Sequence, residues 1–179
     1  MTVRHVAFLR AINTVGRRTK NNELVAVFES AGADFAAGFL ASGNVVFDWP
    51  EAVDDPATAR IEAALSGGLG FEVPALIRRA SEVQAVADHA PFPDSVMREA
   101  EGTMFVAFLR RPLEPEAAAA VMALQTDSDQ LAVHDRQIYW LPMAGEFNSE
   151  LSVPAVERAA GEMTVRTINT VRRISAKFL

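Results

Sequence analysis

Two short segments carry residue types that could bind a ligand. The segment Arg10–Asn21 reads RAINTVGRRTKN, and Ser42-Gly43-Asn44 separates two apolar runs. Basic side chains, small polar groups and the amides at the start of a helix commonly form binding sites for phosphate or carboxylate. We therefore expect an anion site with these candidate ligand-binding residues: Arg10, Asn13, Gly16, Lys20, Ser42, Gly43 and Asn44. The simpler interpretation is that the serine and glycine only make a turn, the asparagine caps it, and the basic side chains lie in solvent.

The pattern of apolar residues places these two segments at one edge of a sheet. The segment Val3–Arg10 is apolar on both faces of a strand, which predicts that it lies at the centre of a sheet. Caps, glycines and apolar periodicity predict the elements that follow: a helix capped by Asn21 or Asn22 and ended by Gly32, a hairpin of Phe35–Ala41 and Asn44–Trp49, a helix capped by Asp55 and ended by Gly67 and Gly68, and a strand over Phe71–Ile77. Right-handed crossovers give this βαββαβ order the strand arrangement 4-1-3-2. The end of the first strand then lies beside the start of the third.

The tetrapeptide AFLR occurs at residues 7–10 and again at residues 107–110. A second βαββαβ order follows the second copy: a strand over 103–110, a helix from Pro115, a hairpin of 131–134 with 137–141, a helix over 151–160 ended by Gly161, a strand over 163–166 and a helix over 170–178. The pattern S-x-x-Q at Ser81 predicts a linking helix to about His89. We predict an α+β protein, a tandem pair of ferredoxin-like units with mainly antiparallel sheets. The expected domains are a first unit over 1–80, a linking helix and loop over 81–100, and a second unit with the terminal helix over 101–179.

A secondary candidate site follows from the same topology in the second unit. The ends of its third and fourth strands share an edge, so we expect these residues to approach one another: Asn148, Ser149, Glu150, Arg166, Asn169 and Thr170. The simpler interpretation is again structural. Ser149 or Ser152 would cap the helix before Pro154, and Asn169 would cap the terminal helix.

Composition and motifs argue against several classes of function. The net charge of −6 and the pI near 5.1 count against nucleic acid as a partner. The run Gly102–Phe108 resembles part of an RNA-recognition signature but lacks its leading basic residue and its second aromatic residue. The chain has no cysteine, and the apolar run near residue 1 is too short for a signal peptide or a membrane span, so we expect a cytoplasmic protein without a membrane partner. The sequence contains no recognised catalytic signature or cofactor motif, and His5, His89 and His134 do not have the spacing of metal ligands. We therefore assign no catalytic residue, cofactor or metal.

Three ordered motifs resemble a bacterial domain-of-unknown-function family, number 1697. Its opening is similar to L-R-G-I-N-V-G-G, and residues 9–16 read LRAINTVG. Its hairpin motif S-G-N-V-V-F stands at residues 42–47, and its tail T-x-R-N-W-N-T-V is echoed at residues 164–171. The resemblance implies paired ferredoxin-like units and brings no established activity or ligand. The chain departs from the family at Ala11, Glu150 and Ile168, where glycine, lysine and tryptophan are common. These departures weaken the case for a ligand at the secondary candidate site more than the case for the site at the 10–21 loop.

The leading hypothesis is binding of a small anionic molecule at the edge formed by the 10–21 loop and the 42–44 hairpin. Arg10 and Lys20 would supply charge, and Asn13, Ser42 and Asn44 would supply hydrogen bonds. The alternative is a protein–protein interaction module or a homodimer without catalysis, because both central strands are apolar on both faces and need a cover on each. RNA binding and an enzyme of unrecognised mechanism rank lower.

Overall fold

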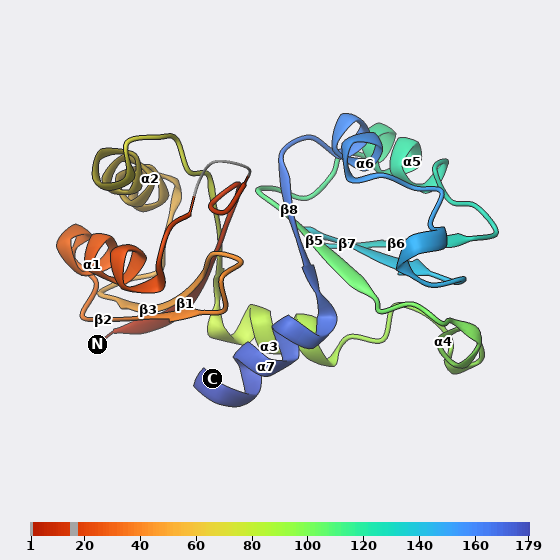
Figure 1. Ribbon diagram of the computed structural model, residues 1–179, viewed down its shortest axis with the longest axis horizontal. Coiled ribbons are helices and arrows are strands. Elements are labelled where there is room, and N and C mark those ends of the chain that lie inside the picture. Colours follow the sequence, from red (N-terminus) through yellow and green to blue (C-terminus); the bar gives the residue numbers. More distant parts are fainter. Residues whose placement is uncertain (1, 15–17) are drawn as a thin grey trace. The chain divides into compact units, whose positions relative to one another are not determined.

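A computed structural model describes residues 2–14 and 18–179 (Figure 1). The described residues form a mixed α+β protein with two four-stranded antiparallel sheets and seven α-helices. The chain forms two compact units, Met1–Val86 with Ile174–Leu179, and Ala87–Arg173. Across the described part of the chain, no helix is long and apolar enough to cross a membrane.

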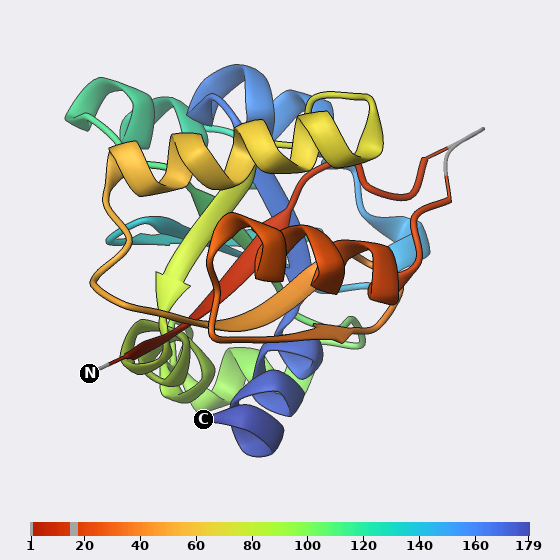
Figure 2. The same cartoon turned by 90° about the vertical axis from the view of Figure 1, so that its left-hand side faces the viewer.

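The first unit is a sheet with the strand order β2-β3-β1-β4 and two helices on one face (Figure 2). Its elements are β1 (Val3–Leu9), α1 (Asn21–Ala31), β2 (Phe35–Phe39), β3 (Asn44–Trp49), α2 (Asp55–Leu69), β4 (Ala75–Arg79) and most of α3 (Ala80–Asp88). Leu24 and Phe28 from α1 and Ile61 and Leu65 from α2 are buried against the sheet in one apolar core. The strand order is the one expected from the sequence.

Strand β1 lies at the centre of this sheet. It pairs antiparallel with β3 and β4, and the pairing sets Phe8 opposite Asn44. Ala7 belongs to the core under the helices, whereas Val6 and Phe8 alternate to the other face, and all three are fully buried. The prediction of a central strand that is apolar on both faces is confirmed.

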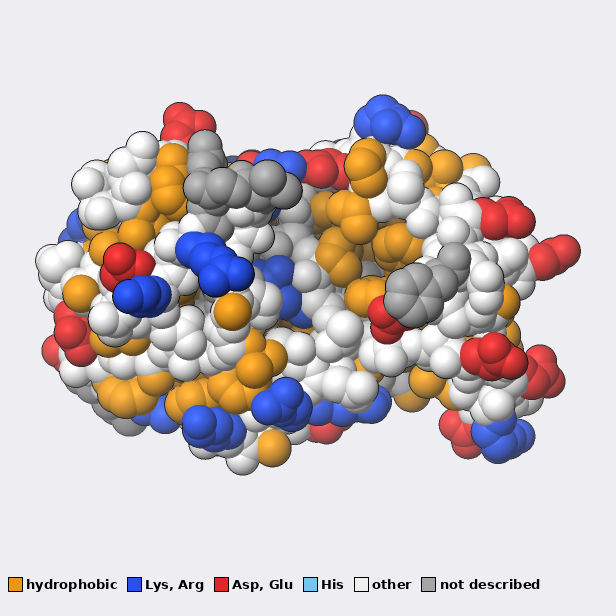
Figure 3. Space-filling view, viewed as in Figure 1, with side chains coloured by type: hydrophobic (Ala, Val, Ile, Leu, Met, Phe, Trp, Pro, Cys, Tyr) orange, Lys and Arg blue, Asp and Glu red, His pale blue; other side chains and the backbone are white. Residues whose placement is uncertain are grey.

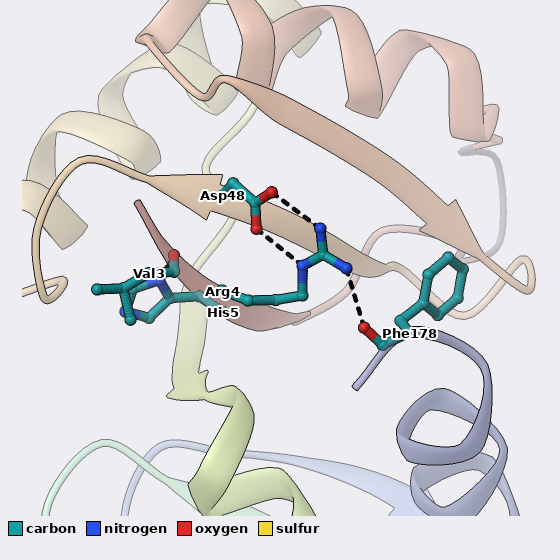
Figure 4. Close-up of polar contacts among 5 residues, drawn as sticks. All are labelled: Val3, Arg4, His5, Asp48 and Phe178. Atoms are coloured by element: carbon teal, nitrogen blue, oxygen red, sulfur yellow. Dashed lines mark hydrogen bonds and ion pairs between the residues drawn. The ribbon is translucent and has the colours of Figure 1, made fainter. Parts of the chain in front are cut away.

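The end of helix α7 (Ile168–Phe178) packs on that other face within the first unit. The rings of Phe178 and Phe39 meet edge to face at 5.9 Å. Arg4 makes a bidentate ion pair with Asp48, Nε to Oδ1 and Nη2 to Oδ2 at 2.8 Å each, and Nη1 donates to the Phe178 carbonyl at 3.0 Å (Figure 4). The Ser175 hydroxyl donates to Gln84 Oε1 of α3 at 2.5 Å. The sequence predicts that the whole terminal helix belongs to the second unit, whereas residues 174–179 belong to the first.

The second unit has the order β6-β7-β5-β8, which is again the expected one. Its elements are α4 (Asp94–Glu99), β5 (Phe105–Leu109), α5 (Pro115–Met122), β6 (Asp129–His134), β7 (Gln137–Pro142), the 3-10 turn η1 (Glu146–Asn148), α6 (Val153–Ala160), β8 (Met163–Thr167) and the first turns of α7. Helices α5 and α6 lie on one face of the sheet (Figure 1). Val121 from α5 and Val156 from α6 pack against Ala107, Leu109 and Trp140.

Several helix ends differ from the expected ones by one residue or more. Helix α1 is capped by Lys20, whose backbone N–H donates to the Glu23 carboxylate at 2.6 Å, so neither Asn21 nor Asn22 is the cap. Asp54, and not Asp55, caps α2 by accepting from the Ala57 N–H at 2.8 Å. The Ser81–Gln84 pattern does not cap α3, because Glu82 accepts from the Arg79 N–H at 2.8 Å.

Helix α2 continues through the glycines that were expected to end it. It stops at Gly70, which has φ +79°. A Cβ at Gly68 would lie 2.7 Å from Val27 Cγ2, so this glycine lets α1 and α2 pack closely. Strand β4 starts at Ala75 rather than Phe71, and α4 was not predicted at all.

Candidate functional site

The 10–21 loop and the 42–44 turn meet at one edge of the first unit. The Leu9 N–H donates to the Gly43 carbonyl at 2.8 Å. Asn13 joins the loop to the turn, because its Nδ2 donates to the Ala41 carbonyl while its Oδ1 accepts from the Thr19 N–H at 2.8 Å. The expected proximity of the two segments is therefore present. We call this place the first-unit edge.

The polar residues of the turn are used within the turn. Asn44 is fully buried, and its Nδ2 donates to the Phe39 carbonyl at 2.9 Å and to Ser42 Oγ at 2.8 Å. Gly43 has φ +74°, and a Cβ there would lie 2.9 Å from Cγ1 of the buried Ile12. Glycine is required here by backbone conformation and by close packing together. Asn44 and Gly43 thus hold the turn in shape and do not face a ligand.

The basic side chains of the first-unit edge remain at its surface. Arg18 and Lys20 are exposed and Arg10 is half-buried. Neither Arg18 nor Lys20 has an ion-pair partner among the described residues. Figure 3 shows Lys and Arg side chains on the face of this unit. Gly16 lies outside the described residues.

A buried carboxylate that the sequence analysis missed organises the second candidate edge. Asp129 is fully buried at the start of β6. Its Oδ1 accepts from Trp140 Nε1 at 2.7 Å and from Ser149 Oγ at 2.5 Å, and its Oδ2 accepts from the backbone N–H groups of Glu150 at 2.9 Å and Leu151 at 3.2 Å. Burial raises the pKa of Asp129, but these four hydrogen bonds outweigh it and the net pKa is below the usual value. A single aspartate at a strand start has no sequence signal that separates it from a solvated one.

The structure does not bring Ser149 to Arg166. Val165 lies on the helix-covered face of the sheet with Phe105, so Arg166 points to the opposite face. There its Nη1 donates to Thr164 Oγ1 at 2.9 Å and to the Val165 carbonyl at 2.7 Å, and burial lowers its pKa to about 10.

Asn148 and Asn169 also make no common site. The Asn148 side chain donates to the Ala144 carbonyl at 2.7 Å. Asn169 is exposed and is not the cap of α7, because Thr167 Oγ1 accepts from the Thr170 N–H at 3.2 Å.

A known protein family matches most of this chain. The family described as "Protein of unknown function (DUF1697)" matches residues 1–139. The chain belongs to this family. The matched range includes the motifs at residues 9–16 and 42–47, whereas the motif at 164–171 lies beyond it.

One solved structure supports the DUF1697 fold. The chain is similar to the conserved bacterial protein SP0830 from Streptococcus pneumoniae, with a TM-score of 0.77, 18% identity and 98% of each chain covered. At this identity the similarity shows the fold alone. No curated protein matches the chain.

Two residues at which this DUF1697 member departs from the family motifs can be described from their conformation and burial. Ala11 has φ +54°, a left-handed conformation that suits the glycine common in the family. Ile168 is 3% exposed, so it serves the core and not a stacking surface. Phe108, in the run Gly102–Phe108 that resembles an RNA-recognition signature, is fully buried and cannot stack on a base.

The described contacts of the histidines in this DUF1697 chain lie within their own unit. His5 Nδ1 is 2.8 Å from the Val3 carbonyl, and its Nε2 accepts from the Val53 N–H at 3.3 Å. These partners fix the neutral tautomer with the proton on Nδ1, and burial is the main reason that the pKa of His5 is lowered. His89 and His134 stack at 4.3 Å, and burial followed by the charge of His134 lowers the pKa of His89.

The described residues line hollows elsewhere in the DUF1697 fold, and two of these do not include the first-unit edge. One of about 550 Å³ in the first unit is lined by Trp49, Glu51, Asp54 and Arg60, and the Arg60 guanidinium covers the Trp49 ring at 4.7 Å. The other, of about 350 Å³ in the second unit, is lined by Phe105, Trp140 and Ser149 among others. Ser149 of the secondary candidate edge therefore borders an apolar hollow and not a basic one.

Proposed function

We propose that this DUF1697 protein is a binding protein for a small anionic molecule of the phosphate or carboxylate class. The site is the first-unit edge. Arg10, Arg18 and Lys20 supply positive charge, and the loop amides supply hydrogen bonds. The proposal includes no catalytic step. It places the protein in the cytoplasm and interprets the two units as ferredoxin-like copies, which the repeated AFLR and the shared strand order support.

The observation that carries the proposal is the anchoring of the loop by Asn13. Its two hydrogen bonds hold the loop against the turn and close it onto Thr19. Arg18 and Lys20, the exposed cations on either side of Thr19, are thereby kept at one edge. Their side chains have no ion-pair partner among the described residues. In a protein of net charge −6, such a group of cations favours an anion locally against the overall field.

The start of helix α1 adds to this charge. Lys20 is its N-cap, and the amides at a helix N-terminus carry a partial positive charge. Glu23 already occupies the backbone N–H of Lys20. The anion therefore depends on the basic side chains and on the amides of Asn21 and Asn22, and the buried Asn44 takes no part.

A paired-variant binding experiment tests the proposal. Calorimetric titration of the wild type with inorganic phosphate, pyrophosphate and citrate is compared with Arg18→Ala/Lys20→Ala and with a control, Arg98→Ala/Arg158→Ala. Each double variant removes two exposed cations, so the change in net charge is the same. We expect the loop variant to bind about tenfold more weakly and the control to bind as the wild type. Equally weakened binding in the two double variants would show that net charge alone causes the loss. The absence of binding to all three anions would refute the proposal.

A further inference from the structure

The hollow of the second unit is an apolar pocket with one acidic side chain. It encloses about 350 Å³, at the lower end of the range for small-molecule sites of about 300–1,000 Å³. Its walls include Phe105, Trp140, Leu151, Val153 and Val165, and Glu146 is the one ionisable residue among the described residues that line it. Figure 3 shows hydrophobic side chains around a hollow in the second unit beside an acidic side chain.

The walls of the pocket are held in place. Phe105, Trp140 and Val165 come from the adjacent strands β5, β7 and β8. The rings of Phe105 and Trp140 are tilted at 46° with centroids 5.6 Å apart. Asp129 fixes the Trp140 indole and also the loop that carries Leu151. A pocket of this kind exists before a ligand arrives, so binding costs little ordering entropy.

The first unit differs from the second at the residue that corresponds to Phe105. His5 and Phe105 hold the same place, two residues before the repeated AFLR. In the first unit the His5 ring stacks on Phe47 at 5.5 Å and accepts the Val53 N–H, so the loop after β3 is bonded to the ring. Phe105 cannot accept a hydrogen bond, and the corresponding loop is bonded to Asp129 instead. The change of anchor leaves an apolar space against the Phe105 ring.

The charge of the pocket selects the ligand. The Glu146 carboxylate is exposed and has no ion-pair partner in the described part of the chain. Ser149 Oγ is already bonded to Asp129 and Leu151, so it offers little to a ligand. Aromatic faces and a carboxylate together favour a cation attached to an apolar body.

We propose that this pocket binds a small organic cation, an amine or quaternary ammonium group carried on an aromatic or aliphatic body. The apolar body lies against Phe105, Trp140 and Val165, and the cation lies beside Glu146. The site is independent of the first-unit edge and takes ligands of opposite charge.

Matched probes test this proposal on the full chain. Phenethylamine, 2-phenylethanol and phenylacetate share a body and differ in charge, and tetramethylammonium carries the charge with almost no body. Binding is measured by calorimetry and by the indole N–H signal of Trp140, one of two tryptophans in the chain. We expect phenethylamine to bind with a dissociation constant of about 1 mM or below, 2-phenylethanol more weakly, and the other two probes not measurably.

Two variants separate the charge from the cavity. Glu146→Gln should weaken phenethylamine about fivefold and leave 2-phenylethanol unchanged, whereas the control Glu116→Gln on α5 should change neither. Val153→Trp, at a position that is 41% exposed, should fill the pocket and abolish binding of every probe. Equal affinity for phenylacetate and phenethylamine, or an unchanged amine affinity in Glu146→Gln, would overturn the assignment of a cation. Binding by none of the probes, or full binding by Val153→Trp, would overturn the site.

Discussion

Replacing Asp129 by asparagine should destabilise the second unit strongly. The carboxylate accepts four hydrogen bonds, two on each oxygen. An asparagine retains the two backbone donors if its oxygen faces Glu150 and Leu151, and the Ser149 hydroxyl can turn to accept from its amide. The indole N–H of Trp140 then faces an N–H₂ group and loses its acceptor. An orphaned buried donor costs about 1–3 kcal/mol, and the remaining bonds lose their charge, so we expect a loss of about 3 kcal/mol in the free energy of unfolding.

Urea denaturation followed by far-ultraviolet circular dichroism measures this loss. The matched variant is Trp140→Phe, which keeps a ring but removes the N–H donor. Because the two side chains share one hydrogen bond, the double variant should cost about 1 kcal/mol less than the sum of the single variants. A loss below about 0.5 kcal/mol for Asp129→Asn, or strict additivity in the cycle, would refute the role assigned to this carboxylate.

The pH dependence gives a second check on Asp129. The folded-state pKa is lower than the unfolded value near 3.8, so the unfolded chain takes up the proton first as the pH falls. The stabilisation is therefore complete above about pH 4 and is lost as the pH falls through the folded pKa. The difference between wild type and Asp129→Asn should shrink in the same range.

Three further outcomes are expected. Because the pKa of His5 is lowered, its stabilisation is complete above about pH 6.5 and is lost as the pH falls. His5→Gln should therefore reduce the slope of the unfolding free energy against pH between pH 6.5 and 5, by at most about 1.4 kcal/mol per pH unit. A slope in His5→Gln equal to that of the wild type would contradict this. Ala11→Gly should raise the free energy of unfolding by about 1 kcal/mol, because glycine relieves the left-handed conformation, and a loss in thermal denaturation would argue against strain there. Gly43→Ala should lower it by about 2 kcal/mol through the clash with Ile12 and the positive φ, and a neutral result would show that the turn rearranges.

The sequence predicted the order of elements well because apolar alternation and turn residues are local signals. The two AFLR strands, the hairpin at Ser42-Gly43 and the stop at Gly161 needed no knowledge of distant partners. Helix ends were less accurate where packing decides them. Gly67 and Gly68 read as a stop, but the contact of Gly68 with Val27 keeps them inside α2.

The sequence also predicted only part of the candidate sites. Topology brought the 10–21 loop to the 42–44 turn correctly, because strand order alone decides which segments share an edge. It could not reveal that Asn44 is buried or that Ser149 bonds to Asp129, because these depend on side-chain direction. The pocket beside Phe105 was missed because it also depends on side-chain contacts. Phe105 stands where the first unit has His5, and Asp129 bonds the adjoining loop.

The most direct test of the anion site is an amide NMR titration of the wild-type protein with inorganic phosphate. The proposal predicts saturable shifts concentrated in the 10–21 loop and at Asn21 and Asn22, with smaller changes in the 40–44 turn and none around Trp140. Shifts spread evenly over the basic surface, or centred elsewhere in the chain, would contradict binding at the first-unit edge.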